Sequence, residues 1–148
     1  MAARTAAAAA AALLCGTLGL GVLAVSSIPS GAATTATLFV DNVNGTATTG
    51  CTASGASACK TIQEGVTAAE ALSGTAVTLD VAGSSTTYAE TATSGVTISV
   101  PTGDSLDIEG TGSPQPTLDN GGAGSNITIP NASAGAVTID HMNINGGV

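Results

Sequence analysis

The chain has 148 residues, with ten acidic side chains, two basic ones and a formal net charge of −8. A protein that binds nucleic acid needs clustered Lys and Arg to neutralise phosphates, so this charge balance excludes that class of function. The sequence has no Trp, one Tyr and one Phe. Its core must therefore consist of thin layers of Val, Ile, Leu and Ala, which suits a solenoid whose repeats pack only on their neighbours.

Residues 1–33 have the layout of a secretory signal peptide. A short positive start at Met1–Arg4 precedes an apolar stretch over residues 6–25, and a helix-breaking region ending in small residues follows. We predict cleavage after Ala33, with Ala32 and Ala36 as neighbouring sites. The mature protein is then secreted or held at the cell surface, and no part of it contacts the membrane.

Two other interpretations of this segment remain open. An apolar stretch of this length can span a bilayer as an uncleaved anchor, although Ala and Gly make it only weakly hydrophobic. A lipoprotein signal ending at Cys15 is disfavoured because Leu14 stands where such a signal requires Gly or Ala. After cleavage, residues 34–148 keep ten carboxylates against Lys60 alone, a formal charge of −9.

Residues 34–75 form the first part of the predicted mature domain. An alternating run predicts a first strand, with Leu38 and Val40 on one face and Phe39 on the other. A loop rich in Thr, Ser, Gly and Ala follows and holds Cys51 and Cys59. In an exported protein these two cysteines most simply form a disulfide, whereas a zinc site lacks further Cys or His ligands nearby.

A short helix is predicted after this loop. Thr61 and Glu64 match a capping box, in which each side chain accepts from the backbone of the other residue. One apolar stripe follows, formed by Ile62, Val66, Ala69 and Leu72, and Ser73-Gly74 ends the helix. We expect this helix to cover the open end of a solenoid.

Residues 76–148 consist of short apolar runs separated by turns rich in Gly, Asn, Asp and Pro. Each run places Val, Ile or Leu at every second position, the period of a strand with one buried face. Three of the runs recur at spacings near thirty residues and predict neighbouring strands, starting at Val77, Leu106 and Val137. The runs are 77–81, 96–100, 106–109, 117–119, 127–129 and 137–140.

Several motifs in this order resemble the opening of right-handed parallel β-helix proteins of the pectin-lyase-like family. They are Leu38-Phe-Val-Asp41, Cys59-Lys-Thr-Ile-Gln63, Ala76-Val-Thr-Leu-Asp-Val-Ala-Gly83, Tyr88-Ala-Glu90, Leu106-Asp-Ile-Glu-Gly110 and Val137-Thr-Ile-Asp-His-Met-Asn-Ile-Asn-Gly-Gly147. The resemblance implies an all-β fold, a right-handed parallel β-helix with a short N-terminal capping α-helix. It also implies a chain that stops early, as a fragment or with its last coil pairing edge to edge with another copy.

Outward-facing carboxylates are the candidate functional groups. Asp80, Asp107 and Asp140 follow apolar positions and are predicted to form a column on successive strands, about 4.8 Å apart. Such a column is either a carbohydrate or calcium face, a glycosidase pair, or simply a solvated surface. Asp119, in a turn with Asn and two Gly, is a further candidate calcium ligand; the sequence predicts no other cofactor.

The only imidazole and two asparagines complete the candidates. His141 has the inward parity of Ile139, which predicts a hydrogen-bonded structural histidine. Asn143 and Asn145 are expected to satisfy turns at coil corners. A polyuronate lyase of the family that the chain resembles commonly uses an Arg base, and residues 34–148 contain no Arg.

The sequence therefore predicts a secreted or cell-surface β-helix module without a catalytic site, which has a structural, adhesive or carbohydrate-binding role. Polysaccharides or other cell-surface components are its expected partners. The alternative is the N-terminal part of a polysaccharide-degrading lyase or glycoside hydrolase whose active site lies beyond residue 148.

Overall fold

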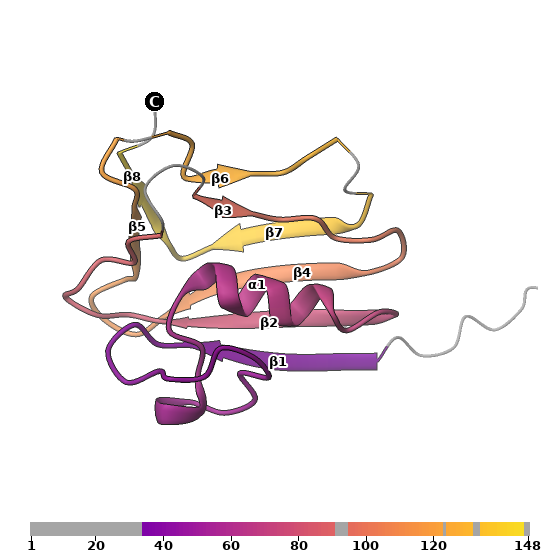
Figure 1. The fold of residues 1–148 in the computed structure, drawn as a ribbon, viewed down its shortest axis with the longest axis horizontal. Helices are drawn as coiled ribbons and strands as arrows, with labels where there is room; N and C mark the ends of the chain where they lie inside the picture. Colours follow the sequence, from indigo (N-terminus) through magenta and orange to yellow (C-terminus); the bar gives the residue numbers. More distant parts are fainter. Residues whose placement is uncertain (1–33, 91–94, 123, 132–133, 147–148) are drawn as a thin grey trace, which may run out of the picture. The chain divides into compact units, whose positions relative to one another are not determined.

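The computed structural model describes residues 34–90, 95–122, 124–131 and 134–146. The predicted signal peptide, 1–33, lies outside the described residues. The described part of the chain consists mostly of β-strands with one α-helix, and its paired strands run parallel (Figure 1). This agrees with the predicted all-β class. No helix among these residues is long and apolar enough to cross a membrane.

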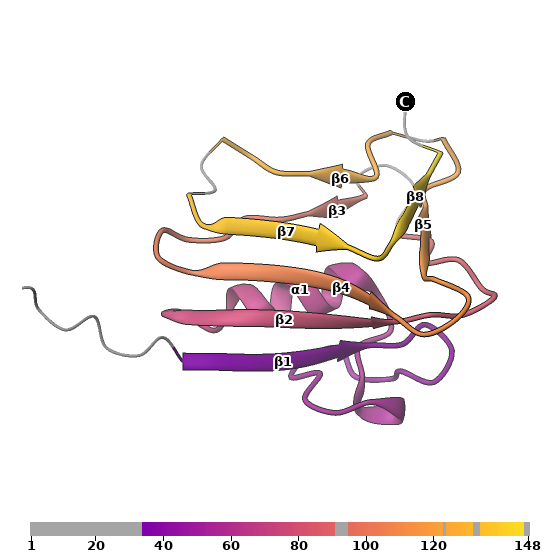
Figure 2. The same cartoon turned by 180° about the vertical axis from the view of Figure 1, so that it is seen from behind.

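The largest sheet, sheet A, is the element that the apolar spacing predicts. Its strands lie in the order β1 (Thr34–Val40), β2 (Thr75–Ala82), β4 (Ser105–Thr111) and β7 (Ala136–Asp140), as Figures 1 and 2 show from opposite sides. Val77 pairs with Leu106, and Leu106 pairs with Val137, steps of 29 and 31 residues. The prediction that these three residues lie in neighbouring parallel strands is confirmed.

Two smaller parallel sheets receive the remaining strands. Sheet B pairs β5 (Thr117–Asp119) with β8 (Asn143–Asn145), and sheet C pairs β3 (Val96–Thr97) with β6 (Ile127–Thr128). Tyr88 extends sheet B through an isolated parallel bridge to Leu118. From β2 onward the chain therefore visits sheets A, B and C in rotation.

Some strands differ from the sequence prediction. Strand β3 is shorter than the run 96–100, although Val96, Ile98 and Val100 are all buried as the alternation predicts. The prediction for Asn143 and Asn145 is wrong, because they belong to strand β8, where they pair with Thr117 and Asp119. The partner strand lies 26 residues earlier, from Asn143 back to Thr117, so no local pattern marks the pairing.

The core lies on the inward face of sheet A. Leu38, Leu79, Ile108 and Ile139 occupy one register row, and the first three are at most 3% exposed. Ile139, in the outer strand β7, is only half-buried. Stacked aliphatic layers of this kind let a chain without Trp bury a continuous core.

Helix α1 (Ile62–Glu70) begins at the predicted cap. The Thr61 side chain accepts from the Glu64 backbone N–H at 3.1 Å, and Glu64 Oε2 accepts from the Thr61 N–H at 3.1 Å. The helix ends at Glu70, so Leu72 does not belong to its apolar stripe and is 37% exposed. Gly74, four residues beyond the end of the helix at Glu70, takes the left-handed conformation with φ +71°.

The helix contacts β1, β2 and β3 and lies against the inward side of sheet A (Figure 1). Gly65 makes this close approach possible, because a Cβ there would lie 2.6 Å from a Val40 methyl carbon. The Gln63 amide bonds both backbone groups of Thr97, accepting from its N–H at 2.7 Å and donating to its carbonyl at 3.3 Å. The Gln63 side chain therefore satisfies the outer edge of β3 at Thr97, whereas the loop described below pairs with the outer edge of β1 at Phe39.

Candidate binding face

The outward face of sheet A carries the predicted carboxylates in two register rows. One row contains Phe39, Asp80, Glu109 and Asp140, and the other contains Thr37, Thr78, Asp107 and Thr138. The predicted column of Asp80, Asp107 and Asp140 is therefore wrong at its middle position, which belongs to Glu109. The sequence spacing between Val77 and Leu106 already predicted this register, because the same step along the chain places Asp80 opposite residue 109.

The neighbouring row contains one unsatisfied group. An Asp107 carboxylate oxygen is buried without a hydrogen-bond partner among the described residues. Threonines precede and follow it in the row, at 78 and 138. Asp107 thus lies beside the row of Asp80, Glu109 and Asp140, called the carboxylate row below, rather than inside it.

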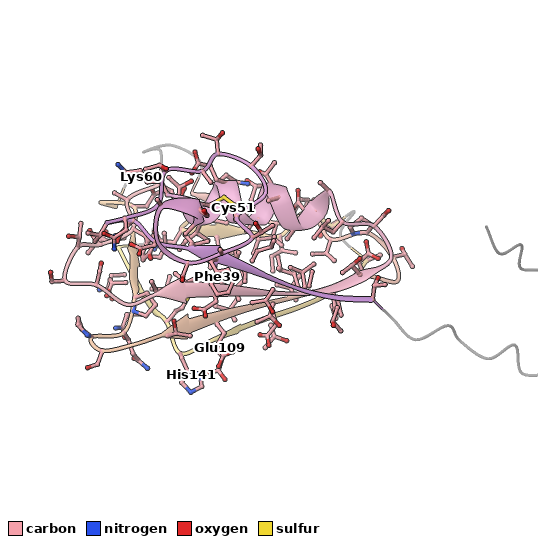
Figure 3. The ribbon with its side chains drawn as sticks, turned by 90° about the horizontal axis from the view of Figure 1, so that it is seen from below. Phe39, Cys51, Lys60, Glu109 and His141 are labelled. Carbon is pink, nitrogen blue, oxygen red and sulfur yellow. A yellow bond between two sulfur atoms is a disulfide. The ribbon has the colours of Figure 1, made fainter. Side chains whose placement is uncertain are left out.

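A pocket of about 300 Å³ lies at the start of the carboxylate row. Phe39 and Asp80 are direct neighbours in the register, and the Thr111 hydroxyl donates to Asp80 Oδ1 at 2.5 Å. Ser54 and Ala58, from the loop after β1, line the other side. Figure 3 shows Phe39 and Glu109 on the side of sheet A away from α1. An aromatic ring thus lies beside carboxylate and hydroxyl groups, a combination that sequence reasoning missed.

The wall of this pocket is held by the cysteine-containing loop. Cys51 and Cys59 are buried with their sulfur atoms at bonding distance, and their Cα atoms are 5.0 Å apart. The 3₁₀ turn η1 (Gly55–Ser57) lies between them. No group of three metal-ligating side chains occurs among the described residues, so nothing there supports the zinc alternative.

Asp41 begins this loop and also lines the pocket. Its Oδ1 accepts from the backbone N–H groups of Val43 and Asn44, both at 2.9 Å. Partial burial acts to raise the pKa of Asp41, but the hydrogen bonds from Asn44 and Val43 outweigh it and leave that pKa below its ordinary value. Asp41 is therefore ionised at neutral pH and contributes negative charge to the pocket.

Asp119 lies apart from these carboxylates. It belongs to β5 in sheet B, and its Oδ1 accepts from the Gly121 N–H at 2.8 Å in a local turn. The structure therefore does not bring Asp119 together with Asp80 or Asp140. A calcium site that uses all of them would require ligands from two different sheets.

The prediction for His141 is wrong. The residue has φ +52° at the end of β7, so it leaves the strand alternation that predicted an inward side chain. Its side chain is 58% exposed, and its Nδ1 lies 3.5 Å from Asp140 Oδ1. His141 therefore forms a surface contact with its neighbour Asp140.

The buried carboxylate of Glu90 is a feature that sequence reasoning missed. Its Oε1 accepts from the Ile62 N–H at 2.7 Å and the Gln63 N–H at 3.4 Å, at the start of α1. Burial raises the pKa of Glu90; those two hydrogen bonds lower it in part, and the neighbouring Glu64 charge raises it further. Glu90 follows a strand bridge by two residues and has no local helix-capping pattern, so only the tertiary structure shows its role.

The carboxylate row has the spacing but not the environment of a hydrolytic pair. Neighbouring strands are about 4.8 Å apart, close to the separation of the two carboxyls in a retaining glycosidase. Such an enzyme also needs one acid in a desolvated site. Glu109 and Asp140 are exposed and Asp80 is only partly buried, so the row is better suited to hydrogen bonding than to proton transfer.

No family model, curated protein or solved structure matches this chain. Its function must therefore be inferred from the site itself.

Proposed function

We propose that this protein is an exported parallel β-helix module that binds neutral carbohydrate on the outward face of sheet A. The observation that carries the proposal is the pocket in which Phe39 lies beside Asp80 and Thr111. A structural or adhesive role is the wider class to which this function belongs.

The β-helix part of the proposal is supported by the order in which the chain visits its sheets. Sheets A, B and C receive strands in rotation, and the register steps within sheet A after β2 are close to thirty residues. Parallel strands require crossover connections, and stacking of successive coils supplies them without intervening helices. The resemblance to pectin-lyase-like proteins agrees with this arrangement.

The carbohydrate part is supported by the chemistry of the pocket. A sugar ring has an apolar face that packs on an aromatic side chain, and its hydroxyl groups donate to carboxylate oxygens. Phe39 offers the first contact, and Asp80 with Asp41 offers the second. The surrounding negative charge repels polyuronates, so the expected ligands are neutral polysaccharides.

The test is a titration of the isotope-labelled protein with neutral glucan, xylan and mannan oligosaccharides, with oligogalacturonate as the charged comparison. We expect NMR shift changes at Phe39 and Asp80 with a neutral ligand, and loss of these changes in Phe39→Ala. Val43→Ala is the matched control, because Val43 is apolar, 60% exposed and not among the pocket residues. Binding that is equal in the Phe39→Ala variant, or absent for every ligand, contradicts the proposal.

Export is tested separately by the N-terminus of the secreted product. The signal-peptide interpretation predicts that the secreted protein begins at Thr34, after cleavage at Ala33. Mass spectrometry of the protein from an export-competent host measures this directly. A product that keeps residues 1–33 contradicts cleavage.

Polysaccharide degradation is a second candidate, which rests on the adjacency of Asp80 and Glu109 alone, since neither carboxylate is in a desolvated site. A reducing-end assay with the same polysaccharides tests it. Product formation that is lost in Glu109→Gln supports an enzyme, and the absence of product supports a binding module.

A further inference from the structure

The end of the outer edge of β1, at Phe39, pairs with the loop that contains both cysteines. We propose that this loop, residues 41–59, is an edge guard whose disulfide keeps β1 from pairing with a second copy of the chain. The guard is redox-sensitive, because reduction of the Cys51–Cys59 bond releases it from the strand.

Three hydrogen bonds join the two cysteines to β1 and the residue after it. The Phe39 N–H donates to the Cys51 carbonyl at 2.8 Å, and the Cys59 N–H donates to the Phe39 carbonyl at 2.9 Å. The Asp41 N–H donates to the Cys59 carbonyl at 2.8 Å. The residues that form the disulfide therefore provide the backbone pairing, which couples the covalent bond directly to the covering of the edge.

A second strand laid along β1 would need the same backbone groups. Phe39 and Asp41 point their N–H groups to the side of β1 opposite β2, and Thr37 has the same parity. While the loop is attached, an incoming strand meets occupied donors and acceptors over this half of β1. Detachment of the loop presents a continuous edge.

The sequence of β1 shows why such an edge favours a second copy. Thr34-Thr-Ala-Thr-Leu-Phe-Val40 is uncharged, contains no Pro or Gly, and is rich in residues of high β-propensity. This is the composition of a segment that pairs edge to edge when it is exposed. Natural sheets commonly protect such edges with charges, and β1 has none, so the loop provides the protection.

The loop is tightly fitted against the strand end. A Cβ on Gly45 would lie 2.4 Å from the Asp41 carbonyl oxygen and 2.5 Å from the Cys59 carbonyl oxygen. The Ala47 N–H also donates to the Ala58 carbonyl at 3.0 Å. The covered position is thus a packed arrangement that depends on keeping the two ends of the loop together.

The chemical step is reduction by a dithiol. The dithiol supplies two electrons and two protons, the bond between the two sulfur atoms breaks, and two thiols form while the dithiol becomes a disulfide. The disulfide closes a loop of about nine residues, from Cys51 to Cys59. When the bond is reduced, bringing the two ends of this loop together again costs conformational entropy, so the equilibrium constant for the closed loop should fall roughly a hundredfold.

Amide hydrogen exchange tests the release of the guard. In the purified protein we expect a dithiol to accelerate exchange at Phe39 and Asp41 by about a hundredfold, with β2 amides unchanged. The Cys51→Ser/Cys59→Ser variant should behave in the same way without reductant. Protection of both amides that survives reduction overturns the proposal, and general loss of protection in β2 shows unfolding instead of release and also overturns it.

Sedimentation velocity tests the partner, with the oxidised protein at the same concentration as the baseline. We expect the reduced protein and the double Ser variant to gain a concentration-dependent heavier species. Thr37→Pro added to the double Ser variant removes a donor from this edge and should restore the baseline; Thr37→Lys is the second variant, which keeps the backbone intact. A heavier species that persists in both Thr37 variants, or none after reduction, overturns the proposal.

Discussion

The two outer strands of sheet A, β1 and β7, differ in what surrounds them. Strand β1 pairs with β2 on one side and with the cysteine-containing loop on the other, and its inward residues Leu38 and Val40 are at most 3% exposed. Strand β7 pairs with β4 alone among the described residues, and its inward Val137 and Ile139 are half-buried. An inward-facing residue of sheet A is therefore fully buried only where a neighbouring layer covers it on both sides. Alternation of apolar and polar residues along its own strand is not enough.

The largest expected effect on the free energy of unfolding comes from a core residue in an enclosed strand, compared with one in an outer strand. Leu79 is fully buried between Leu38 and Ile108, so Leu79→Ala should lower the free energy of unfolding by about 3–4 kcal/mol. Ile139→Ala should cost roughly half as much, because the side chain is already partly in water. Urea unfolding measures both variants. Equal losses would break the comparison between the two strands.

The next effect concerns the packing of α1 on the enclosed end. Gly65→Ala places a Cβ 2.6 Å from Val40 and 2.8 Å from Leu79, both of which are fully buried. We expect a loss of about 1–3 kcal/mol, despite the better helix propensity of Ala. Thr67→Ala, on the exposed side of the same helix, is the control and should change stability by about 0.5 kcal/mol or less. A neutral Gly65→Ala would show that the helix is not tightly packed.

Glu90 gives a pH-dependent effect at the start of α1. Its raised pKa means that the folded state holds the proton more tightly than the unfolded state. The stabilising contribution of protonated Glu90 is therefore complete below pH 4.5, the ordinary pKa of a glutamic acid. It is lost as the pH rises through the pKa of Glu90 in the folded state.

Two variants separate the charge of Glu90 from its hydrogen bonds. Glu90→Gln should remove this pH dependence and match or exceed the wild-type stability at pH 7. Glu90→Ala leaves the Ile62 N–H unsatisfied and should lose about 1–3 kcal/mol. Urea unfolding between pH 4 and 8 checks both, and an unchanged pH profile in Glu90→Gln contradicts the assignment.

The smallest effect concerns the Tyr88 hydroxyl, which donates to the Ala82 carbonyl at 2.7 Å. Tyr88→Phe should cost about 1 kcal/mol at pH 7. Burial raises the pKa of Tyr88 from 10.0 to about 12, so wild-type stability should fall as the pH rises from 10 through 12. Thermal unfolding at pH 7 to 11 measures this fall, which should be absent in Tyr88→Phe; its persistence there would assign the alkaline loss to another group.

The strands of sheet A could be predicted because their signal is local. Val and Leu alternate with polar residues in β2, as Leu and Ile do in β4, and the near-thirty-residue recurrence of this pattern predicted the pairing of Val77 with Leu106. The start of α1 was equally readable, since both partners of its capping box lie within four residues. Its end was not, because Leu72 continues the apolar spacing although the helix stops at Glu70.

The candidate site was harder to predict, because its contacts join distant parts of the chain. Phe39 and Asp80 become neighbours only through the β1–β2 register, a step of 41 residues that no repeat in the sequence indicates. The Glu90 contact with α1 and the Gln63 contact with β3 are also long-range and involve single polar side chains. The composition predicted an acidic surface, but only the register shows which carboxylates share a row.

The most direct test of the whole account is a set of methyl–methyl NOEs in the labelled protein. Successive layers of parallel strands predict strong NOEs from Leu38 to Leu79, from Leu79 to Ile108 and from Ile108 to Ile139. These contacts span three strand pairs and depend on no ligand. Their absence, or backbone NOEs that place β2 and β4 antiparallel, would contradict the stacked parallel arrangement and the binding face built on it.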